Sequence, residues 1–261
     1  ATSNGDPIDI NLERIGGHWP SLPSAARSDS AVAAFLELHV EQGAVLEQRR
    51  DAIGIVEGIV GQRRFSIHVK GQANHAGTTP MGLRQDALAA ASRIVLAVEE
   101  MARCHPGDPV ATVGRLEVWP NAANVVPGSV SMTVDIRDLD PAVLDQLVSC
   151  LQDALESIGL ETGCAIQLEP QFQVSPTPAD ALVMATIETV AEDLGLSLSR
   201  LPSRASHDAQ EIGRRWPMGM IFVPSREGLS HSAAEFTSDS HCLAGTAVLL
   251  HTLERLDRVL S

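Results

Sequence analysis

Between residues 63 and 172 the apolar side chains follow two periodicities in a fixed order. Residues 63–70 alternate, with Phe65, Ile67 and Val69 on one side, and this pattern predicts a half-buried strand. Further patterns predict helices at 83–101 and 140–159 and strands at 111–118, 129–137 and 165–172. This order, strand, helix, strand, strand, helix, strand, predicts a ferredoxin-like β-α-β-β-α-β module with both helices on one face of an antiparallel sheet.

The segments on either side of this module predict a different layer. Residues 34–40 and 218–223 are near-continuous apolar runs, as expected of strands covered on both faces in an α/β sheet. Helical spacing over 179–194 and 239–260 supplies the covering helices. We therefore expect an α/β fold in which an open-sheet domain is interrupted by the ferredoxin-like module. The expected bounds are 1–61 for its first segment, with a polar connector over 1–33, then 62–174 for the module and 175–261 for its second segment.

The charge balance argues against two classes of partner. The 19 Lys and Arg residues against 33 Asp and Glu give a net charge of −14, which repels nucleic acid phosphates and anionic lipid headgroups. No apolar run is long enough to cross a bilayer. The four cysteines are scattered without a C-x-x-C pair, as is typical of free thiols in a reducing compartment. We expect a cytoplasmic protein with neither nucleic acid nor membrane partners.

Two candidate metal ligands follow the apolar runs. His39 ends the first run, just before polar Glu41 and Gln42, and His231 follows the second run. Side chains at the ends of such strands are held rigidly and face a crevice, so both imidazoles are candidate metal ligands. Ser232 and Glu235 have the spacing of a capping box, which predicts that a helix begins there. Two histidines do not complete a divalent metal site, and further ligands are required.

Other candidates lie in loops. His75 lies in a small-residue loop over 71–80, where an imidazole could donate to a developing oxyanion. Asn124 and Arg137 offer amide and guanidinium donors for a substrate carboxylate, although Arg137 could instead pair with Asp135 or Asp138. Spacing alone also leaves two roles open for Asp208, which could orient His207 or cap the following helix.

Six ordered motifs carry a family resemblance. They are F-L-E-L-H-V-E-Q-G, G-Q-A-N-H-A-G-T-T-P-M, N-A-A-N-V-V-P-G, D-I-R, S-H-D-A-Q and F-V-P-S-R-E-G-L-S-H-S. From about Phe35 to the C-terminus the chain resembles the N-carbamoyl-L-amino acid hydrolase, allantoate amidohydrolase and β-ureidopropionase family. This family belongs to the aminoacylase and glutamate carboxypeptidase clan of two-metal hydrolases.

The resemblance implies a catalytic open-sheet domain that binds two divalent ions (Zn, Mn, Co or Ni), with the ferredoxin-like module as a lid that also forms a homodimer. By position, His39 and His231 match metal ligands. Gln42, Asn124, Arg137 and His207 match residues that hold or surround the substrate, and Arg137 takes its carboxylate. His75 matches the lid histidine that reaches the neighbouring protomer's site and stabilises the tetrahedral oxyanion.

The implied reaction is cleavage of a linear C–N amide in an N-carbamoyl-L-amino acid or allantoate, with release of ammonia and carbon dioxide. The chain lacks the family's H-x-D strand, bridging aspartate and paired glutamates, so we expect it to be inactive alone and to need a separate N-terminal polypeptide or a missing segment. The family's S-G-A-G-H-D is S-R-A-S-H-D here, so Arg204 and Ser206 are expected to change the pocket. Two alternatives remain: an aminoacylase or dipeptidase of the same clan, and a non-catalytic ligand-binding subunit that lacks the metal centre.

Overall fold

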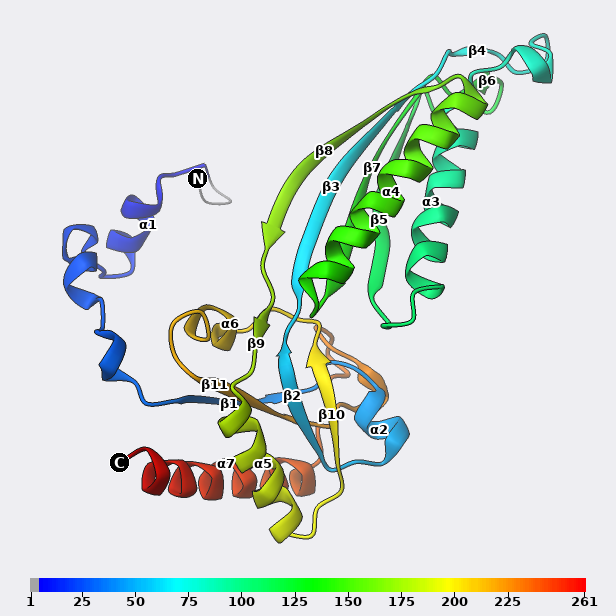
Figure 1. Ribbon diagram of the computed structural model, residues 1–261. Helices are drawn as coiled ribbons and strands as arrows, with labels where there is room; N and C mark the ends of the chain where they lie inside the picture. Colours follow the sequence, from blue (N-terminus) through cyan, green and yellow to red (C-terminus); the bar gives the residue numbers. More distant parts are fainter. Residues whose placement is uncertain (1–4) are drawn as a thin grey trace.

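The computed structural model describes residues 5–261 and shows two α/β parts stacked end to end (Figure 1). One part contains a mixed five-stranded sheet, called sheet A, and the other a four-stranded antiparallel sheet, called sheet B. Both sheets are open, which confirms the predicted α/β class. In residues 5–261 none of the helices has both the length and the apolar character that a membrane span requires.

Sheet A has the strand order β1-β11-β2-β10, and β9 pairs with β2 beside this path. The strands are β1 (Phe35–Val40), β11 (Met218–Val223), β2 (Ile53–Ile59), β10 (Leu198–Ser203) and β9 (Thr177–Pro178). Helices α5 (Ala181–Asp193) and α7 (Asp239–Leu260) cover one face, while α2 (Val45–Arg49) and α6 (Asp208–Ile212) cover the other. Because β1 and β11 are parallel neighbours, their carboxyl ends lie at the same edge of the sheet.

The buried strand β11 shows why an apolar run forms the centre of this sheet. Met218, Met220 and Phe222 pack into the cluster with α2 and α6, while Ile221 and Val223 pack into the cluster with α5 and α7. Every residue of β11 is buried. In contrast, β1 is only half-buried along its whole length, because it lies at the edge of the sheet and has β11 as its one strand neighbour among the described residues. The prediction of full cover on both faces is therefore wrong for β1.

Sheet B has the order β5-β7-β3-β8, with every pair antiparallel. Its strands are β3 (Gly61–Lys70), β5 (Val110–Trp119), β7 (Ser129–Asp138) and β8 (Ala165–Val174). Helices α3 (Ala87–Arg103) and α4 (Pro141–Thr162) pack on one face, over Ile67, Val134 and Ile136. This is the ferredoxin-like arrangement, and we call it the lid. At its far end β4 (Asn74–His75) pairs with β6 (Val125–Val126).

Local capping sets the helix ends in the lid. Asp140 accepts from the N–H of Ala142, so α4 begins at Pro141 as predicted, but it continues to Thr162 and ends at left-handed Gly163 (φ 68°). The expected start of α3 at residue 83 is wrong. Asp86 accepts from Leu88 and Ala89 and fixes the helix start at Ala87.

Three strands of sheet A, β2, β9 and β10, were not predicted. Glycines interrupt the apolar run of β2, β9 has only two residues, and β10 is short and contains Pro202. Proline is compatible with the position of β10 at the edge of the sheet.

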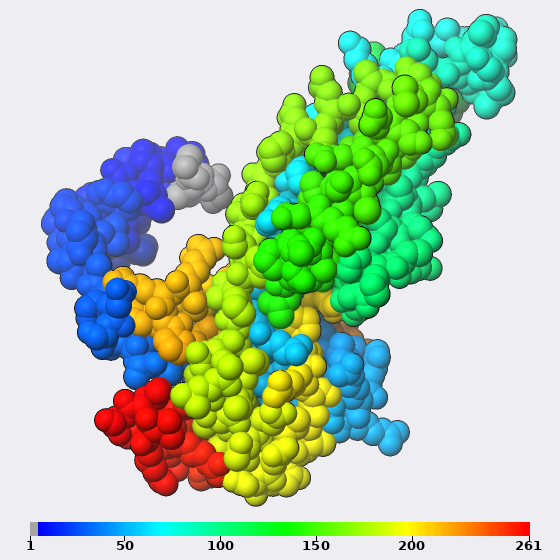
Figure 2. Space-filling model, in the orientation of Figure 1, coloured from blue at the N-terminus to red at the C-terminus, as the bar shows by residue number. Residues whose placement is uncertain are grey.

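Residues 5–33 form an arm that stands apart from both sheets (Figure 2). The arm contains α1 (Ile8–Arg14) and two 3-10 helices, η1 (Trp19–Ala25) and η2 (Asp29–Ala31), none of which has a buried residue. It is attached near β11, where Arg215 and Trp216 donate to Asp29. A third 3-10 helix, η3 (Met81–Leu83), lies in the lid, and η4 (Arg226–Gly228) follows β11.

Candidate functional site

The candidate residues of the open-sheet domain lie at the carboxyl ends of β1 and β11. His39 pairs in register with Phe222, and Val40 pairs with Val223, so the loops that follow both strands leave the sheet at one edge. The first loop carries Gln42 and the second carries His231. This edge is where the sequence analysis expected a crevice.

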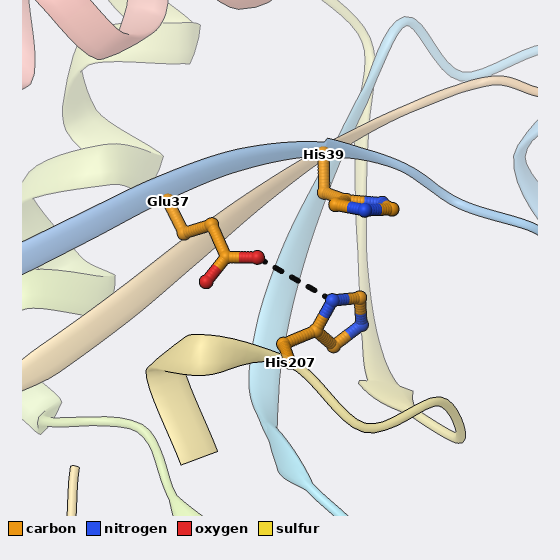
Figure 3. A group of neighbouring side chains, drawn as sticks. All are labelled: Glu37, His39 and His207. Atoms are coloured by element: carbon orange, nitrogen blue, oxygen red, sulfur yellow. Dashed lines mark ion pairs between the residues drawn. The ribbon is translucent and has the colours of Figure 1, made fainter. Parts of the chain in front are cut away.

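A group of Glu37, His39 and His207 lies beside this edge (Figure 3). Their potential ligand atoms all lie within 4.8 Å of one another. The rings of His39 and His207 meet edge to face, with centroids 4.6 Å apart. Sequence reasoning did not select Glu37. The signal for it was present, because residues two apart on a strand point to the same face, and Glu37 stands two before His39.

Backbone contact sets the tautomer of His39. Its Nδ1 lies 2.8 Å from the carbonyl oxygen of Val40. A carbonyl oxygen only accepts, so Nδ1 carries the proton in the neutral ring and Nε2 keeps its lone pair. A neutral imidazole with one nitrogen held by a carbonyl is the usual form of a metal-binding histidine. His39 therefore fits the predicted role of a metal ligand.

His207 is held on both sides of its ring. Its side chain is 3% exposed, with Nδ1 3.4 Å from Glu37 Oε1 and Nε2 2.8 Å from Ser203 Oγ. Burial, together with the charge of nearby His39, lowers the pKa of His207 to about 4, while Asp208 acts weakly in the opposite direction. The ring is neutral at neutral pH, and both of its nitrogens already have partners in the protein.

Glu37 makes the contacts with His207 and with the following helix that were the two alternatives for Asp208. Glu37 Oε2 accepts from the backbone N–H of Ala209, 3.0 Å away, in the first turn of α6. Its other oxygen faces His207. The Glu37 carboxylate on β1 therefore accepts from a backbone N–H at the start of α6 and also lies beside the His207 ring that precedes this helix.

Gln42 and His231 form a second contact. Gln42 has a left-handed backbone (φ 59°), and its N–H donates to Ser225 Oγ at 3.1 Å. Its side-chain amide donates to Ser230 Oγ at 3.0 Å and lies 3.4 Å from His231 Nε2. An amide N–H only donates, so His231 presents its Nε2 lone pair on this side. His231 is not in the Glu37, His39 and His207 group.

The predicted helix start at Ser232 is wrong. Glu235 accepts from the backbone N–H of His231 at 2.8 Å, but the segment forms turns, and α7 begins only at Asp239. Ser238 is its N-cap and accepts from His241. The contact of Glu235 therefore stabilises the loop that carries His231, rather than a helix. Like Gln42, His231 has a left-handed backbone (φ 57°).

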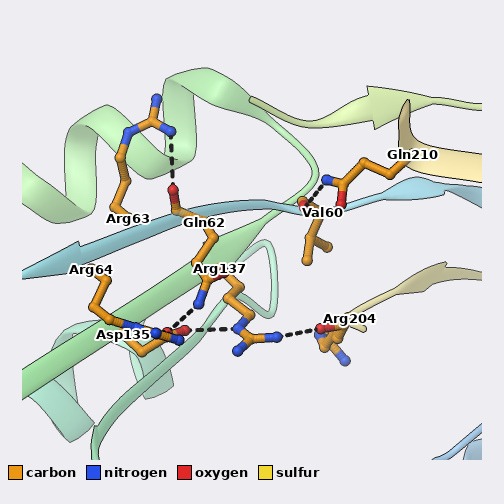
Figure 4. A network of polar contacts seen from close by, with 8 residues as sticks. All are labelled: Val60, Gln62, Arg63, Arg64, Asp135, Arg137, Arg204 and Gln210. Carbon is orange, nitrogen blue, oxygen red and sulfur yellow. Dashed lines mark hydrogen bonds and ion pairs between the residues drawn. The ribbon is translucent and has the colours of Figure 1, made fainter. Parts of the chain in front are cut away.

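Arg137 lies at the lid end nearest to sheet A (Figure 4). Its Nε donates to Asp135 at 2.7 Å, the ion pair that the sequence analysis held as an alternative, and its Nη1 donates to the carbonyl of Arg204 at 2.7 Å. Asp135 also accepts from Arg64 and Gln62. Burial alone would raise the pKa of Asp135, but the hydrogen bonds from Arg137, Arg64 and Gln62 outweigh it and hold that pKa below its usual range.

His75 and Asn124 lie at the opposite end of the lid, on or next to the β4 and β6 pair, and within one chain the structure does not bring them to the Glu37, His39 and His207 group (Figure 1). His75 Nδ1 accepts from the N–H groups of Gly77 and Thr78, at 3.0 and 3.3 Å. The neutral ring therefore carries its proton on Nε2, which is a free donor.

These residues fit a divalent cation. His39 offers an Nε2 lone pair, whereas that of His231 accepts from Gln42. Borderline-soft ions such as Zn²⁺ prefer neutral imidazole and carboxylate ligands. The carboxylate of Glu37 already contacts Ala209 and His207. His39 is therefore better placed as a ligand than Glu37 and His207, and His231 would have to exchange its contact with Gln42 for the ion.

Comparisons with known proteins identify the family to which the chain is similar. Residues 13–255 match the model of the family described as peptidase family M20/M25/M40. The chain is 40% identical to an N-carbamoyl-L-amino acid amidohydrolase of Geobacillus stearothermophilus, covering 94% of this chain and 60% of that protein. It is also 40% identical to an allantoate amidohydrolase of Escherichia coli, covering 97% of this chain and 61% of that protein.

Solved structures give the same picture. An amidase of the hydantoinase/carbamoylase family from Burkholderia multivorans superposes with a TM-score of 0.89 at 37% identity, covering 99% of this chain and 62% of that one. Aminopeptidase PepT from Bacillus cereus, at 18% identity and a TM-score of 0.66, shares the fold. The chain spans about 60% of the length of the curated relatives that it matches.

Proposed function

Because the chain belongs to peptidase family M20/M25/M40 and is similar over most of its length to amidohydrolases, we propose that it forms the lid and part of the metal centre of a metal-dependent amidohydrolase. The proposed reaction is cleavage of a linear C–N amide in an N-carbamoyl-L-amino acid or allantoate, with ammonia and carbon dioxide as products. The observation that carries the proposal is the meeting of His39 and the loop that carries His231 at one edge of sheet A, where His39 Nε2 keeps its lone pair and His231 Nε2 accepts from Gln42.

In this proposal His39 and His231 are ligands of two divalent ions (Zn, Mn, Co or Ni). Bound there, such ions would polarise the carbamoyl carbonyl and lower the pKa of a water molecule. Two imidazoles do not complete the coordination of two ions. The remaining ligands and the general base therefore come from residues beyond these 261, in the same polypeptide or another, and we propose that the 261 residues alone are inactive.

The substrate is held by groups from both parts of the chain. Arg137 uses Nε and Nη1 in contacts within the protein, and Nη2 has no partner among residues 5–261, so it can donate to the substrate carboxylate. Gln42 and His207 line the same edge of sheet A and contact the polar part of the substrate. A carbamoyl or ureido compound with a carboxylate matches these donors.

His75 and Asn124 act in a second protomer. Both lie at the far end of the lid, and the His75 Nε2–H is the donor that a tetrahedral oxyanion needs. We therefore propose a homodimer formed through the lid, in which each lid end reaches the partner's site. The free thiols of all four cysteines favour a reducing compartment, and we propose a cytoplasmic location.

The test is an ammonia assay with N-carbamoyl-L-amino acids and with allantoate. The chain is mixed with a polypeptide that carries the missing ligands, and each of Mn, Co, Ni and Zn is added in turn. Turnover that is lost in His39→Ala and kept in His68→Ala, an exposed lid histidine, supports the proposal. No turnover with full metal loading would contradict it. Calorimetry with the carbamoyl acid in the presence of a chelator identifies the non-catalytic alternative, which would bind the acid without metal.

A further inference from the structure

The lid joins sheet A through two neighbouring covalent connections. Val60 alone separates β2 from β3, and Ser175 and Pro176 separate β8 from β9. The N–H of Val60 donates to the Ser203 carbonyl at 2.9 Å, and its carbonyl accepts from Gln210 Nε2 at 3.2 Å. Both backbone groups of Val60 are therefore fixed by the sheet A part (Figure 4).

Arg137 adds a contact from the lid to sheet A. It lies on β7, and its Nη1 donates at 2.7 Å to the carbonyl of Arg204, in the loop that follows β10. Asp135 holds the other side of the guanidinium through Nε. The Arg204 carbonyl and Asp135 thus fix the plane of this group and leave Nη2 without a partner among residues 5–261.

Arg204 crosses the same boundary in the opposite direction. Its Nη2 donates to the carbonyl of Asp108 at 2.6 Å and lies 3.1 Å from Asp108 Oδ2. Asp108 belongs to the lid, in the loop between α3 and β5, and has a left-handed backbone (φ 59°). Arg204 therefore contacts the lid twice. Its carbonyl accepts from Arg137, and its own guanidinium donates to Asp108.

The two contacts between Arg204 and Asp108 differ in strength. The side chain of Asp108 is 91% exposed, so solvent screens its ion pair with Arg204. The bond to the Asp108 carbonyl joins a charged donor to a backbone acceptor, and such bonds are stronger than bonds between neutral groups. The carbonyl is therefore the more important acceptor.

We propose that Arg204 is a positioning residue that holds the lid at a fixed orientation to sheet A and thereby places Arg137 for the substrate. The inference rests on the proposed function only in the role of Arg137. It also accounts for the arginine in S-R-A-S-H-D, where the family motif has glycine, because a glycine has no side chain to reach Asp108. Arg204 was expected to change the pocket. It does line a small pocket beside Arg137, and its guanidinium also contacts the lid loop.

The orientation of the lid can be measured without turnover. Cys104 in the lid and Cys242 on α7 are both exposed, and Cys164 is buried, so Cys150→Ser leaves one exposed thiol on each side of the boundary. Spin labels on these two thiols report the distance between the lid and sheet A by double electron–electron resonance. Arg204→Ala should lower the ratio of molecules at the original distance to molecules at other distances roughly tenfold or more, consistent with loss of one charge-assisted hydrogen bond.

Three further variants complete the test. Arg204→Lys should restore most of the original population, because an ammonium can also donate to the Asp108 carbonyl. Asp108→Asn should leave the distribution unchanged, because it keeps that carbonyl. Arg200→Ala is the matched control, since Arg200 pairs with Glu188 within the sheet A part. A distribution for Arg204→Ala that superimposes on the original would overturn the proposal, as would equal broadening in Arg200→Ala.

The kinetic consequence separates this proposal from the proposed function. In an active assembly, Arg204→Ala should raise KM for the carbamoyl acid more than it lowers kcat, because Arg137 contacts the carboxylate rather than the reacting carbon. A fall in kcat with KM unchanged would count against the positioning role. If the distance distribution broadens in Arg204→Ala but no carbamoyl substrate is ever hydrolysed, the proposed function fails and the role of Arg204 in lid orientation stands.

Discussion

Single contacts determine the chemistry available at the candidate site. The Val40 carbonyl selects the tautomer of His39, and the N–H groups of Gly77 and Thr78 select that of His75. In the first ring the free Nε2 is a lone pair, and in the second it is a donor. The same residue type thus presents a lone pair in one place and a hydrogen-bond donor in another.

Removal of either proposed ligand should weaken metal binding. We expect His39→Ala and His231→Ala each to raise the Kd for Zn²⁺ by roughly 100-fold, since loss of even an outer hydrogen-bonding partner costs 10- to 100-fold. Isothermal calorimetry measures this change, with His68→Ala as the control. If Glu37→Gln weakened binding as much as His39→Ala, the ion would instead belong to the Glu37, His39 and His207 group.

Asp135 predicts a dependence of stability on pH. Its carboxylate accepts from Arg137, Arg64 and Gln62, so Asp135→Asn should lower the free energy of unfolding by roughly 2 kcal/mol at pH 7. The pKa of Asp135 in the fold lies below its ordinary value of 3.8, so this stabilisation is complete above about pH 4 and is lost as pH falls through the lowered pKa. Urea unfolding at several pH values should show the two proteins converging below pH 4. A constant gap would contradict this assignment.

At the scale of residues, the sequence located His39 and His231 because polar groups directly after apolar runs lie at strand ends. The spacing of Glu37 from His39 could have indicated it, but its contact with α6 could not be predicted, because Ala209 lies 172 residues away in the sequence. Of the two partners of Arg137, one could be predicted from the sequence and one could not. Asp135 is a neighbour in sequence, whereas the Arg204 carbonyl is brought near only by the packing of the lid on sheet A.

Among the elements, the lid was predictable and the centre of sheet A was not. The lid strands face helices on one side and are exposed on the other, so their residues alternate, and Asp140 marks a helix start by its own side chain. Strand β2 lies between β11 and β10 and is buried on both faces, so it shows no alternation, and its glycines reflect close neighbours rather than turns.

The packing of β11 on α5 gives a test of this close approach. A Cβ at Gly219 would lie 2.4 Å from Val183 Cγ1 and 3.1 Å from Ile187 Cδ1. Gly219→Ala should therefore lower the free energy of unfolding by about 1–3 kcal/mol through overpacking. Gly82→Ala, where a Cβ meets nothing within 4 Å, should change it by less than about 0.5 kcal/mol. Equal urea midpoints for the two variants would contradict so close a contact between β11 and α5.

For the whole molecule, the distribution of buried residues predicts how protection against hydrogen exchange varies. The cores of the two sheets contain all the large fully buried side chains, and α1 and η1 of the arm contain none. Amides of residues 8–25 should exchange within seconds, while those of β3, β7 and β11 should be protected for hours. Mass spectrometry of exchanged peptides measures both. Slow exchange in the arm would show that it is packed against another surface in solution.

The near-continuity of β2 and β3 makes the lid a long lever. With ten residues in β3 and about 3.3 Å per residue, the far end lies roughly 30 Å from Val60. A rotation of only ten degrees at Val60 would therefore displace His75 by about 5 Å, more than the reach of a hydrogen bond. In the proposed dimer, angular precision at the base of the lid therefore decides whether the His75 imidazole at its far end meets the partner's site, and residues that never approach a substrate would govern the rate.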